Sequence, residues 1–336
     1  RVPMIRVLAD MEKEGISIDS TYLNNLDKVF ESELDKLKSG IFEKSGEEFN
    51  LNSPKQLGDI LFDKLKLVSK PKKTKTGQYS TSEEVLSSLA NEHEIIRSIL
   101  EWRSLDKLQN TYVRSLPNEV SSRTGRIHTK FNQTVTTTGR LSSNNPNLQN
   151  IPIRTENGQK IREAFIPKNQ DFELLAADYS QIELRVIASI SKDKSMIDAF
   201  VKNQDIHTIT ASKIYNADPE NITREQRGNA KTVNFGIIYG VSAFGLSQQT
   251  NLSRSESKIM IDNYFENYPG LKDYMSSQID FARNKGYVET IMGRRRYLQN
   301  INSQNNMLRS GAERNAINAP IPVSYTHLRA HETLPN

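Results

Sequence analysis

Hydrophobic residues in the first third of the chain recur at steps of three and four, the spacing that gathers side chains on one face of a helix. The clearest run covers residues 21–42, with apolar positions at Leu23, Leu26, Phe30, Leu34, Leu37 and Ile41. Similar spacing predicts further helical stretches over 53–65 and 82–116. We therefore expect residues 1 to about 120 to be mostly helical.

A lysine-rich segment, residues 70–77, lies between the second and third of these helical stretches. It predicts a hairpin-like tip that carries Lys72, Lys73 and Lys75. Such a tip either is a solvated loop or contacts phosphates, and phosphate contacts would add salt-dependent affinity without sequence specificity.

The pattern changes after Gly125. Residues 126–136 alternate and are rich in β-branched side chains, which predicts a strand. A polar loop over 138–154 follows, dense in amides and hydroxyls and holding Arg140 and Arg154. Donors of this kind suit phosphate and sugar oxygens or the acceptors of the minor groove, and the alternative is a capped irregular connector.

Residues 173–177 predict a short buried strand that ends at Asp178 and passes at once into a helix over 181–190. A carboxylate at the carboxyl end of a strand is where open sheets place metal and ligand chemistry. Its alternative role is to cap the helix that follows. Residues 205–292 are again predicted to be helical.

Within that last stretch, Arg227, Lys231, Phe235 and Tyr239 recur at four-residue steps. Side chains four apart share one face of a helix, so two cations and then two flat rings would form one stripe. A nucleotide presents a polyphosphate and a planar base, which such a stripe would match. The alternative is a solvated face that runs into a core face.

The ends of this helix carry their own signals. Thr223 and Gln226 have the spacing of a capping box at its start. Gly236 and Gly240 each cost a helix about 1 kcal/mol relative to alanine. That cost suggests that something approaches the backbone closely at the aromatic end.

Composition narrows the classes of function. A length of 336 residues with 36% hydrophobic and 25% charged residues is typical of a globular protein of two or three subdomains. A net charge of +5 favours a polyanionic partner. The sequence has no cysteine, which excludes disulfides, thiolate nucleophiles and cysteine-ligated zinc. No apolar run is long enough for a transmembrane helix. The sequence starts with Arg1 and shows no signal-peptide pattern, so we expect the chain to begin inside a longer product.

Three motifs in order point to one family. They are Thr138-Gly-Arg-Leu-Ser-Ser with Pro146-Asn-Leu-Gln-Asn-Ile-Pro, then Asp178-Tyr-Ser-Gln-Ile-Glu-Leu-Arg185, and then 227–240. The chain resembles the polymerase region of family A DNA polymerases, and the collinear match covers residues 1 to about 321. The resemblance implies an α+β, mostly helical right-hand fold. Its parts would be a thumb over 1–125, part of the palm with an antiparallel sheet over 126–200, fingers over 201–300 and a return toward the palm over 301–321.

The resemblance also implies roles at the reacting centre. Asp178 would bind two Mg²⁺ ions, with the Tyr179 carbonyl as a further ligand, and the metals would promote nucleotidyl transfer from a dNTP to the 3′-hydroxyl of a DNA primer. Glu183 would lie under the 2′ position of the sugar and reject ribonucleotides. The remaining nucleotide-binding residues would be Gln181, His207, Arg227, Lys231, Phe235 and Tyr239, and of these Arg227 and Lys231 would also be catalytic together with Asp178.

The same resemblance implies the partners. Primer–template DNA would contact the lysine tip of the thumb and a further set of side chains, namely Arg140, Asn150, Arg154, Arg314 and Asn318. The protein would be monomeric, without a membrane partner, in the bacterial cytoplasm at the nucleoid. A polymerase-like domain of single-subunit RNA polymerases is a rival assignment, but Glu183 argues against it because such an enzyme must admit the 2′-hydroxyl.

Residues 322–336 show no family pattern and no helical or strand period, and we expect a non-native tail there. A native tail, or a metal pair formed by His327 and His331, is the alternative. The His-Asp-Glu turn called motif C, which carries a second metal-bridging carboxylate in the family, does not occur in these 336 residues. We therefore expect the parent enzyme to synthesise DNA and this polypeptide alone to be inactive, or to act as a non-catalytic fragment that binds primer–template DNA.

Overall fold

The computed structural model describes residues 2–137, 139–153, 155–177, 179–250 and 252–321. The chain forms two compact units. The N-terminal unit takes residues 8–131 and 142–175, and the C-terminal unit takes 1–7, 132–141 and 176 onward. Residues 126–200, expected to be one palm segment, are therefore shared between the two units. Among the described residues, no helix is both long and apolar enough to cross a membrane.

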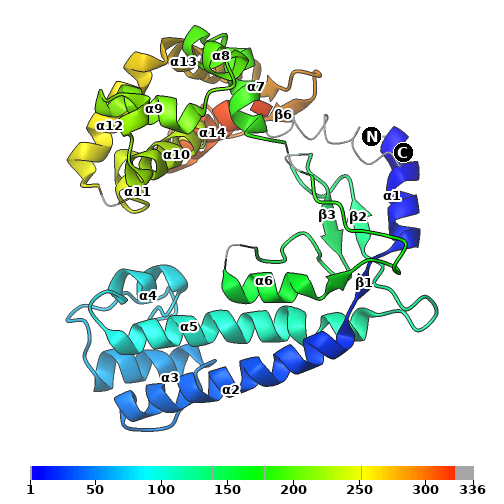
Figure 1. The fold of residues 1–336 in the computed structure, drawn as a ribbon. Coiled ribbons are helices and arrows are strands. Elements are labelled where there is room, and N and C mark those ends of the chain that lie inside the picture. The colour runs from blue at the N-terminus through cyan, green and yellow to red at the C-terminus, as the bar shows by residue number, and fades with distance from the viewer. Residues whose placement is uncertain (1, 138, 154, 178, 251, 322–336) are drawn as a thin grey trace. The chain divides into compact units, whose positions relative to one another are not determined.

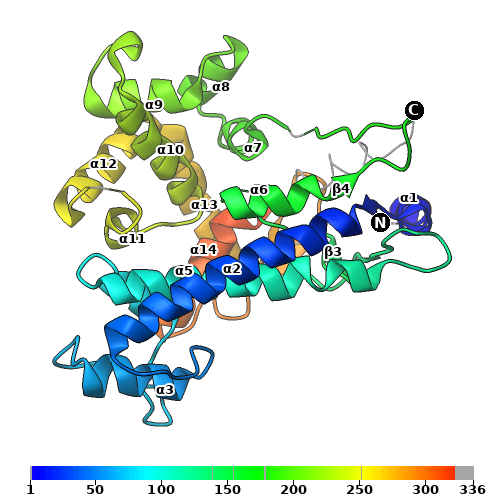
Figure 2. The same cartoon turned by 60° about the horizontal axis from the view of Figure 1, so that its bottom comes forward.

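Two long helices form the body of the N-terminal unit, α2 (Ser20–Ser45) and α5 (Glu94–Leu108), which lie side by side in Figures 1 and 2. The apolar stripe predicted over 21–42 is confirmed, because its residues enter the core against Ile96, Ile99 and Trp102 of α5. Asp19 caps the start of α2 through the Tyr22 amide, and Gly46 ends it in the left-handed conformation, at a φ of 76°.

Shorter elements complete this unit. The helices are the second half of α1 (Val2–Glu14), α3 (Pro54–Gly58), a π-helix (Asp59–Lys64), α4 (Glu83–Leu89), a second π-helix (Gln109–Val113), a 3₁₀ turn (Leu116–Glu119) and α6 (Glu156–Glu163). Strand β1 (Ser17–Ile18) pairs antiparallel with β4 (Phe165–Ile166). Strand β2 (Lys130–Asn132) pairs with β3 (Ser142–Asn144). The helical stretch predicted over 82–116 is thus a series of four shorter elements.

The lysine segment forms the predicted hairpin-like tip. The Thr74 amide donates to the Gln78 carbonyl at 2.7 Å, and the Ser80 amide donates to the Lys72 carbonyl at 2.8 Å. Tyr79 anchors the tip, since its hydroxyl donates to Asp63 at 2.5 Å and its ring lies 4.9 Å from the Lys73 ammonium. Gly58 permits this contact, because a Cβ there would lie 2.8 Å from the Tyr79 Cβ.

Among its described residues, the C-terminal unit is mostly helical and contains one hairpin. Its helices are α7 (Ile182–Ser191), α8 (Lys194–Val201), α9 (Ile206–Tyr215), a 3₁₀ turn (Pro219–Asn221), α10 (Arg224–Ile238), α11 (Ala243–Ser247), α12 (Arg254–Asn267), α13 (Pro269–Lys285) and α14 (Asn306–Asn318). Strand β5 (Tyr287–Glu289) pairs antiparallel with β6 (Arg295–Tyr297). The hairpin interrupts the helical stretch that the sequence predicted over 205–292.

Two strand predictions were wrong in extent or kind. The strand predicted over 126–136 shrinks to β2 and isolated bridges of Ile127 to Ile16 and Val120. Residues 173–177 form no strand, and Leu175 is 92% exposed. An apolar segment becomes a buried strand only where neighbouring strands bond its backbone. In the part of the chain that the structure describes, no strand pairs with 173–177.

The buried carboxylate of Asp193 joins two helices of the C-terminal unit. One oxygen accepts from the Met196 amide at the start of α8, at 3.0 Å. The other accepts from the Gly270 amide in the first turn of α13, at 3.1 Å. A side chain at position 270 would crowd Asp193, since a Cβ there would lie 3.0 Å from its Cα. One side chain therefore satisfies amide donors at both helix starts.

We predict that Asp193→Ala lowers the free energy of unfolding by about 2 to 3 kcal/mol, because it removes an N-cap and leaves a second amide without its acceptor. Urea denaturation gives the size of the loss, and hydrogen exchange should rise in the first turns of both α8 and α13. The control is Asp198→Ala, an exposed carboxylate on α8, for which we expect a change within about 0.5 kcal/mol. Equal effects of the two variants would contradict this assignment.

Candidate functional site

Helix α10 carries the predicted stripe, and its start is the capping box that the sequence indicated. The Thr223 hydroxyl accepts from the Gln226 amide at 3.2 Å, while the Gln226 side chain accepts from the Thr223 amide at 2.9 Å. Both bonds satisfy backbone donors that a helix start leaves unpaired. The helix packs against α9 in the core of the C-terminal unit (Figures 1 and 2).

The two glycines of α10 have a different cause from the one expected. Gly240 adopts a φ of 70°, and the amides of Gly240 and Val241 donate back to the carbonyls of Ile237 and Gly236, which closes the helix in a Schellman motif. A Cβ on Gly240 would lie 2.5 Å from Arg314 Cγ, and one on Gly236 would lie 2.8 Å from Val241 Cγ1. The close approach is made by the protein's own chain.

Both cations of the stripe lie on exposed positions of α10. Arg227 Nε donates to Asp205 Oδ2 at 2.6 Å, and Asp205 also accepts from the Thr208 hydroxyl at 2.6 Å. The same carboxylate caps α9 by accepting from the amides of His207 and Thr208. Burial raises the pKa of Asp205, but the bonds from Arg227 and Thr208 outweigh it and hold that pKa well below its usual range. The guanidinium is therefore oriented by a carboxylate that stays ionised.

His207 lies beside the stripe, with its ring centroid 5.7 Å from that of Phe235. It is buried, and burial lowers its pKa to about 4. Asp205 opposes this shift, while the nearby charges of Arg227 and Lys231 add to it. The imidazole is consequently neutral at physiological pH.

At the far end of the stripe, the Tyr239 hydroxyl donates to Glu183 Oε2 at 2.7 Å. Glu183 lies in the first turn of α7, and Arg140 Nη2 lies 3.6 Å from its other oxygen. The Glu183 side chain is only 15% exposed. Gln181 precedes α7 with a φ of 54° in the left-handed region, which turns the chain into this helix.

The structure thus brings five of the predicted nucleotide-site residues together in the C-terminal unit. Arg227 and His207 share Asp205 as a neighbour, Phe235 contacts His207, and Tyr239 meets Glu183. Tyr179 is 37% exposed, two residues before Gln181. Asp178, the predicted metal ligand, lies outside the described residues.

The predicted DNA-contacting residues are divided between the two units. Lys72, Lys73 and Lys75 are exposed on the tip of the N-terminal unit. Asn150, elsewhere in the same unit, is also exposed, and its carbonyl accepts from the Tyr112 hydroxyl at 2.6 Å. Arg140, Arg314 and Asn318 belong to the C-terminal unit, and Arg154 lies outside the described residues. The Asn318 Oδ1 atom is buried without a hydrogen-bond partner in the described part of the chain.

Metal ligation is not accounted for by the residues that the structure describes. They contain no group of three or more His, Asp or Glu side chains placed to hold an ion. The expected metal ligand Asp178 is not among them, so the described donors do not by themselves fit a magnesium site.

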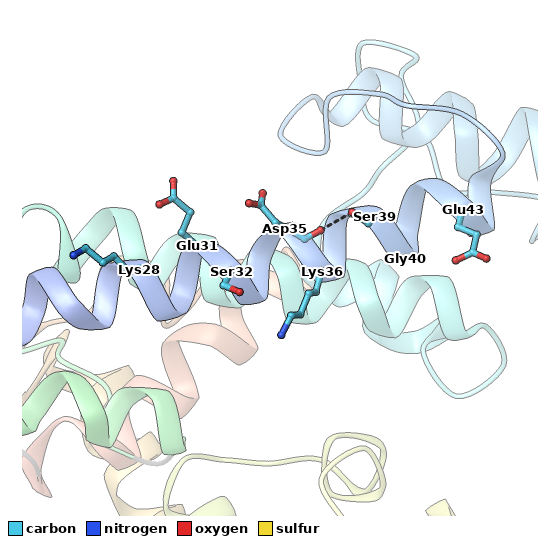
Figure 3. A pocket seen from close by; sticks show the side chains of 8 residues that line it. All are labelled: Lys28, Glu31, Ser32, Asp35, Lys36, Ser39, Gly40 and Glu43. Carbon is cyan, nitrogen blue, oxygen red and sulfur yellow. Dashed lines mark hydrogen bonds between the residues drawn. The ribbon is translucent and has the colours of Figure 1, made fainter.

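A surface depression over α2 lies elsewhere, in the N-terminal unit (Figure 3). All the residues that line it come from one helix, and they carry charges of both signs, among them Lys28, Glu31, Asp35 and Lys36. They point outward and do not converge on a common centre. The depression is a solvated helix face.

One buried side chain of the site was missed in the sequence. Asn234 is fully buried on α10 and donates through Nδ2 to His207 Nδ1 at 3.1 Å. Its position has core spacing, because Ala230, Val233, Ile237 and Ile238 are the other buried residues of α10. A polar residue on that apolar face is the signal that could have identified it.

Comparison with known proteins assigns the chain to a protein family. The profile of DNA polymerase family A matches residues 20–326. The chain belongs to DNA polymerase family A. The match runs five residues beyond Ile321, into the segment expected to be a non-native tail, which lies outside the described residues.

Individual relatives agree with the family match. The chain is 51% identical to DNA polymerase I of Geobacillus stearothermophilus over 322 residues, which is 96% of this chain and 36% of the relative. It is 48% identical to DNA polymerase I of Bacillus subtilis over 323 residues, again 96% of this chain and 36% of the relative. The chain thus spans about a third of the length of these family A polymerases.

A solved structure has the same fold. It is the polymerase domain of Pol1 from M. smegmatis in complex with DNA primer–template and dNTP, which matches with a TM-score of 0.90 at 42% identity. The match covers 99% of this chain and 58% of that chain. The mostly helical α+β polymerase fold predicted from the motifs is therefore confirmed.

The buried state of His207 predicts a pH dependence of stability. Its folded pKa of about 4 lies below the usual 6.5, so the unfolded chain takes up a proton that the folded chain refuses between these values. Stability should therefore fall by up to about 3 kcal/mol as the pH falls from 6.5 to 4. An NMR titration should show His207 neutral down to about pH 4, and a midpoint near 6.5 would contradict its burial.

Proposed function

We propose that this chain is the nucleotide-binding and primer–template-binding part of a DNA polymerase. The parent protein would catalyse template-directed DNA synthesis by nucleotidyl transfer from a dNTP to the 3′-hydroxyl of a DNA primer. The observation that carries the proposal is the stripe along α10 in a family A chain, in which two cations are followed by two aromatic rings and the last ring, Tyr239, bonds Glu183 of α7. The M. smegmatis relative, solved with primer–template and dNTP, supports the same partners.

In this proposal the triphosphate binds at the N-terminal half of the stripe. Arg227 is oriented by Asp205 before a ligand arrives, which reduces the entropy lost on binding. Lys231, one turn further, is exposed and supplies a second charge. His207 adds a neutral donor beside them. Phe235 would pack on the sugar and base, with Tyr239 closing the pocket of the nascent pair.

Selection of deoxyribose is assigned to Glu183. Its carboxylate is mostly buried and is held by Tyr239 on one oxygen, with Arg140 near the other. A carboxylate held on two sides cannot easily move away from a 2′-hydroxyl, and the clash would disfavour ribonucleotides. The left-handed backbone conformation of Gln181 turns the chain into the same helix. This geometry favours a DNA polymerase over an RNA polymerase.

Primer–template DNA would be bound by residues of both units. Arg140, Asn150, Arg154, Arg314 and Asn318 would test pair geometry from the minor groove, and the lysines of the tip would contact the duplex backbone. Residues 1–125 would be the thumb, 126–200 part of the palm, 201–300 the fingers and 301–321 a return to the palm. The protein would act as a monomer in the bacterial cytoplasm.

The proposal includes a two-metal centre with Mg²⁺ in the parent enzyme, held by Asp178, the Tyr179 carbonyl and a second carboxylate from motif C. One carboxylate alone cannot hold two divalent ions about 4 Å apart against their repulsion. The 336 residues contain no His-Asp-Glu sequence. We therefore propose that this polypeptide alone binds primer–template DNA without extending the primer.

Triphosphate binding can be tested on the chain itself. Lys231→Ala should weaken dATP binding about 10- to 100-fold, because it removes a charged hydrogen-bond donor. The matched control is Lys258→Ala, an exposed lysine on α12 of the same unit. Fluorescence or calorimetric titration gives both affinities. Equal affinities for the two variants would refute the triphosphate site, and equal binding of ATP and dATP would refute the role of Glu183.

Catalysis needs a separate assay. With Mg²⁺, dNTPs and a primed template, the 336-residue polypeptide should add no nucleotide to the primer. It should still bind the duplex, and its affinity should fall steeply as salt rises. Magnesium-dependent extension of the primer would refute the proposed inactivity, and salt-independent binding would contradict the phosphate contacts.

A further inference from the structure

A chain of polar side chains is buried beneath the stripe. It consists of Asn234 on α10, His207 and Thr210 on α9, and Tyr268 between α12 and α13. Asn234, Thr210 and Tyr268 are each 0% exposed, and His207 is 3% exposed. Polar groups buried to this degree cost stability unless they bond one another, so their hydrogen bonds form a nearly closed set.

The bonds run continuously from helix to helix. Asn234 Nδ2 lies 3.1 Å from His207 Nδ1 and 3.1 Å from Thr210 Oγ1. Thr210 Oγ1 lies 3.0 Å from the Tyr268 hydroxyl oxygen and 3.2 Å from Asn234 Oδ1. An amide nitrogen has two hydrogens, and here each has one acceptor.

This arrangement fixes the proton of the imidazole. A neutral imidazole has one N–H and one acceptor nitrogen. Because Asn234 donates to Nδ1, Nδ1 must be the acceptor and Nε2 must carry the hydrogen. With Nδ1 bonded to Asn234, Nε2 is the ring nitrogen that would bond a ligand.

The surroundings of His207 suit an anionic ligand. The ring contacts Phe235, and its protonation is influenced by Asp205 on its own helix and by Arg227 and Lys231 on α10. A neutral N–H beside two cations adds a donor without a third positive charge. The opposite tautomer would present a lone pair to phosphate oxygens and repel them.

We propose that Asn234 is a positioning residue that locks His207 in the tautomer with the proton on Nε2, so that the imidazole donates to the triphosphate of the incoming nucleotide. The assignment deepens the proposed nucleotide site and rests on it. Asn234 itself touches no nucleotide. It acts through His207, with Thr210 and Tyr268 holding the amide in its orientation.

The first measurement needs neither a variant nor a nucleotide. Nitrogen-15 NMR of the 336-residue chain near neutral pH should show His207 protonated at Nε2 and unprotonated at Nδ1. Protonation at Nδ1 in the unaltered chain would overturn the proposal at once, since the Asn234 amide would then be reversed.

The second measurement uses Asn234→Asp, which keeps the shape of the side chain but offers only acceptor oxygens when ionised. The His207 proton should move to Nδ1, and the affinity for dATP should fall about 10-fold. The matched control is Asn229→Asp, which adds the same charge to α10 at a residue whose amide bonds the Tyr215 hydroxyl at 3.3 Å. That control distinguishes the effect of losing the tautomer on dATP affinity from the effect of adding a negative charge to α10.

The outcomes are distinct. A tautomer shift with weaker dATP binding in Asn234→Asp than in Asn229→Asp supports the proposal. An unshifted tautomer, or a shift with equal dATP affinities in the two variants, overturns it. If the unaltered chain binds no dATP, the nucleotide site itself fails and the role of Asn234 toward it fails as well, whereas the NMR result still decides the tautomer. Should Asn234→Asp not fold, the tautomer of the unaltered chain remains the deciding measurement.

Discussion

The ion pair between Asp205 and Arg227 sets the geometry of the site, because the same carboxylate begins one helix and orients the next. Asp205 caps α9 through the amides of His207 and Thr208, and its second role is to hold the Arg227 side chain of α10. The pair is partly exposed, so it contributes only about 0.2 to 1 kcal/mol to stability. Its importance is positional: it aligns the start of α9 with the cationic part of α10.

Local patterns predicted much of the fold. The stripe of α2, the capping box of α10 and the lysine hairpin each depend on residues close in sequence, and each is present in the structure. Residues 173–177 show the limit of such patterns. Their apolar run predicts burial, but a strand depends on bonds to other segments, and the leucines here are exposed. Motif order, in contrast, was sufficient to identify the family.

The site was predictable where side chains share one helix face, and less so where they meet across helices. The four-residue steps gave Arg227, Lys231, Phe235 and Tyr239, but no spacing rule links Tyr239 to Glu183, which lies 56 residues away. Asn234 was hidden for the same reason, since its partners lie on α9 and beside α13. The glycines were noticed but misinterpreted, because the atoms that crowd them, in Val241 and Arg314, could be found only in three dimensions.

The closure of α10 at Gly240 has a mechanical consequence. Two backbone bonds clamp this end, with Arg314 packed against it, whereas the first turn is largely exposed and is joined to α9 by the Arg227–Asp205 ion pair and the Asn229–Tyr215 hydrogen bond. A tilt of the helix about its Gly240 end would therefore move the first turn furthest. At a rise of about 1.5 Å per residue, the Arg227 backbone lies roughly 20 Å from Gly240, so a tilt of about 5° would displace it by about 1.7 Å. A small rotation at the Gly240 end would therefore give its largest displacement at the start of the helix, where Arg227 lies.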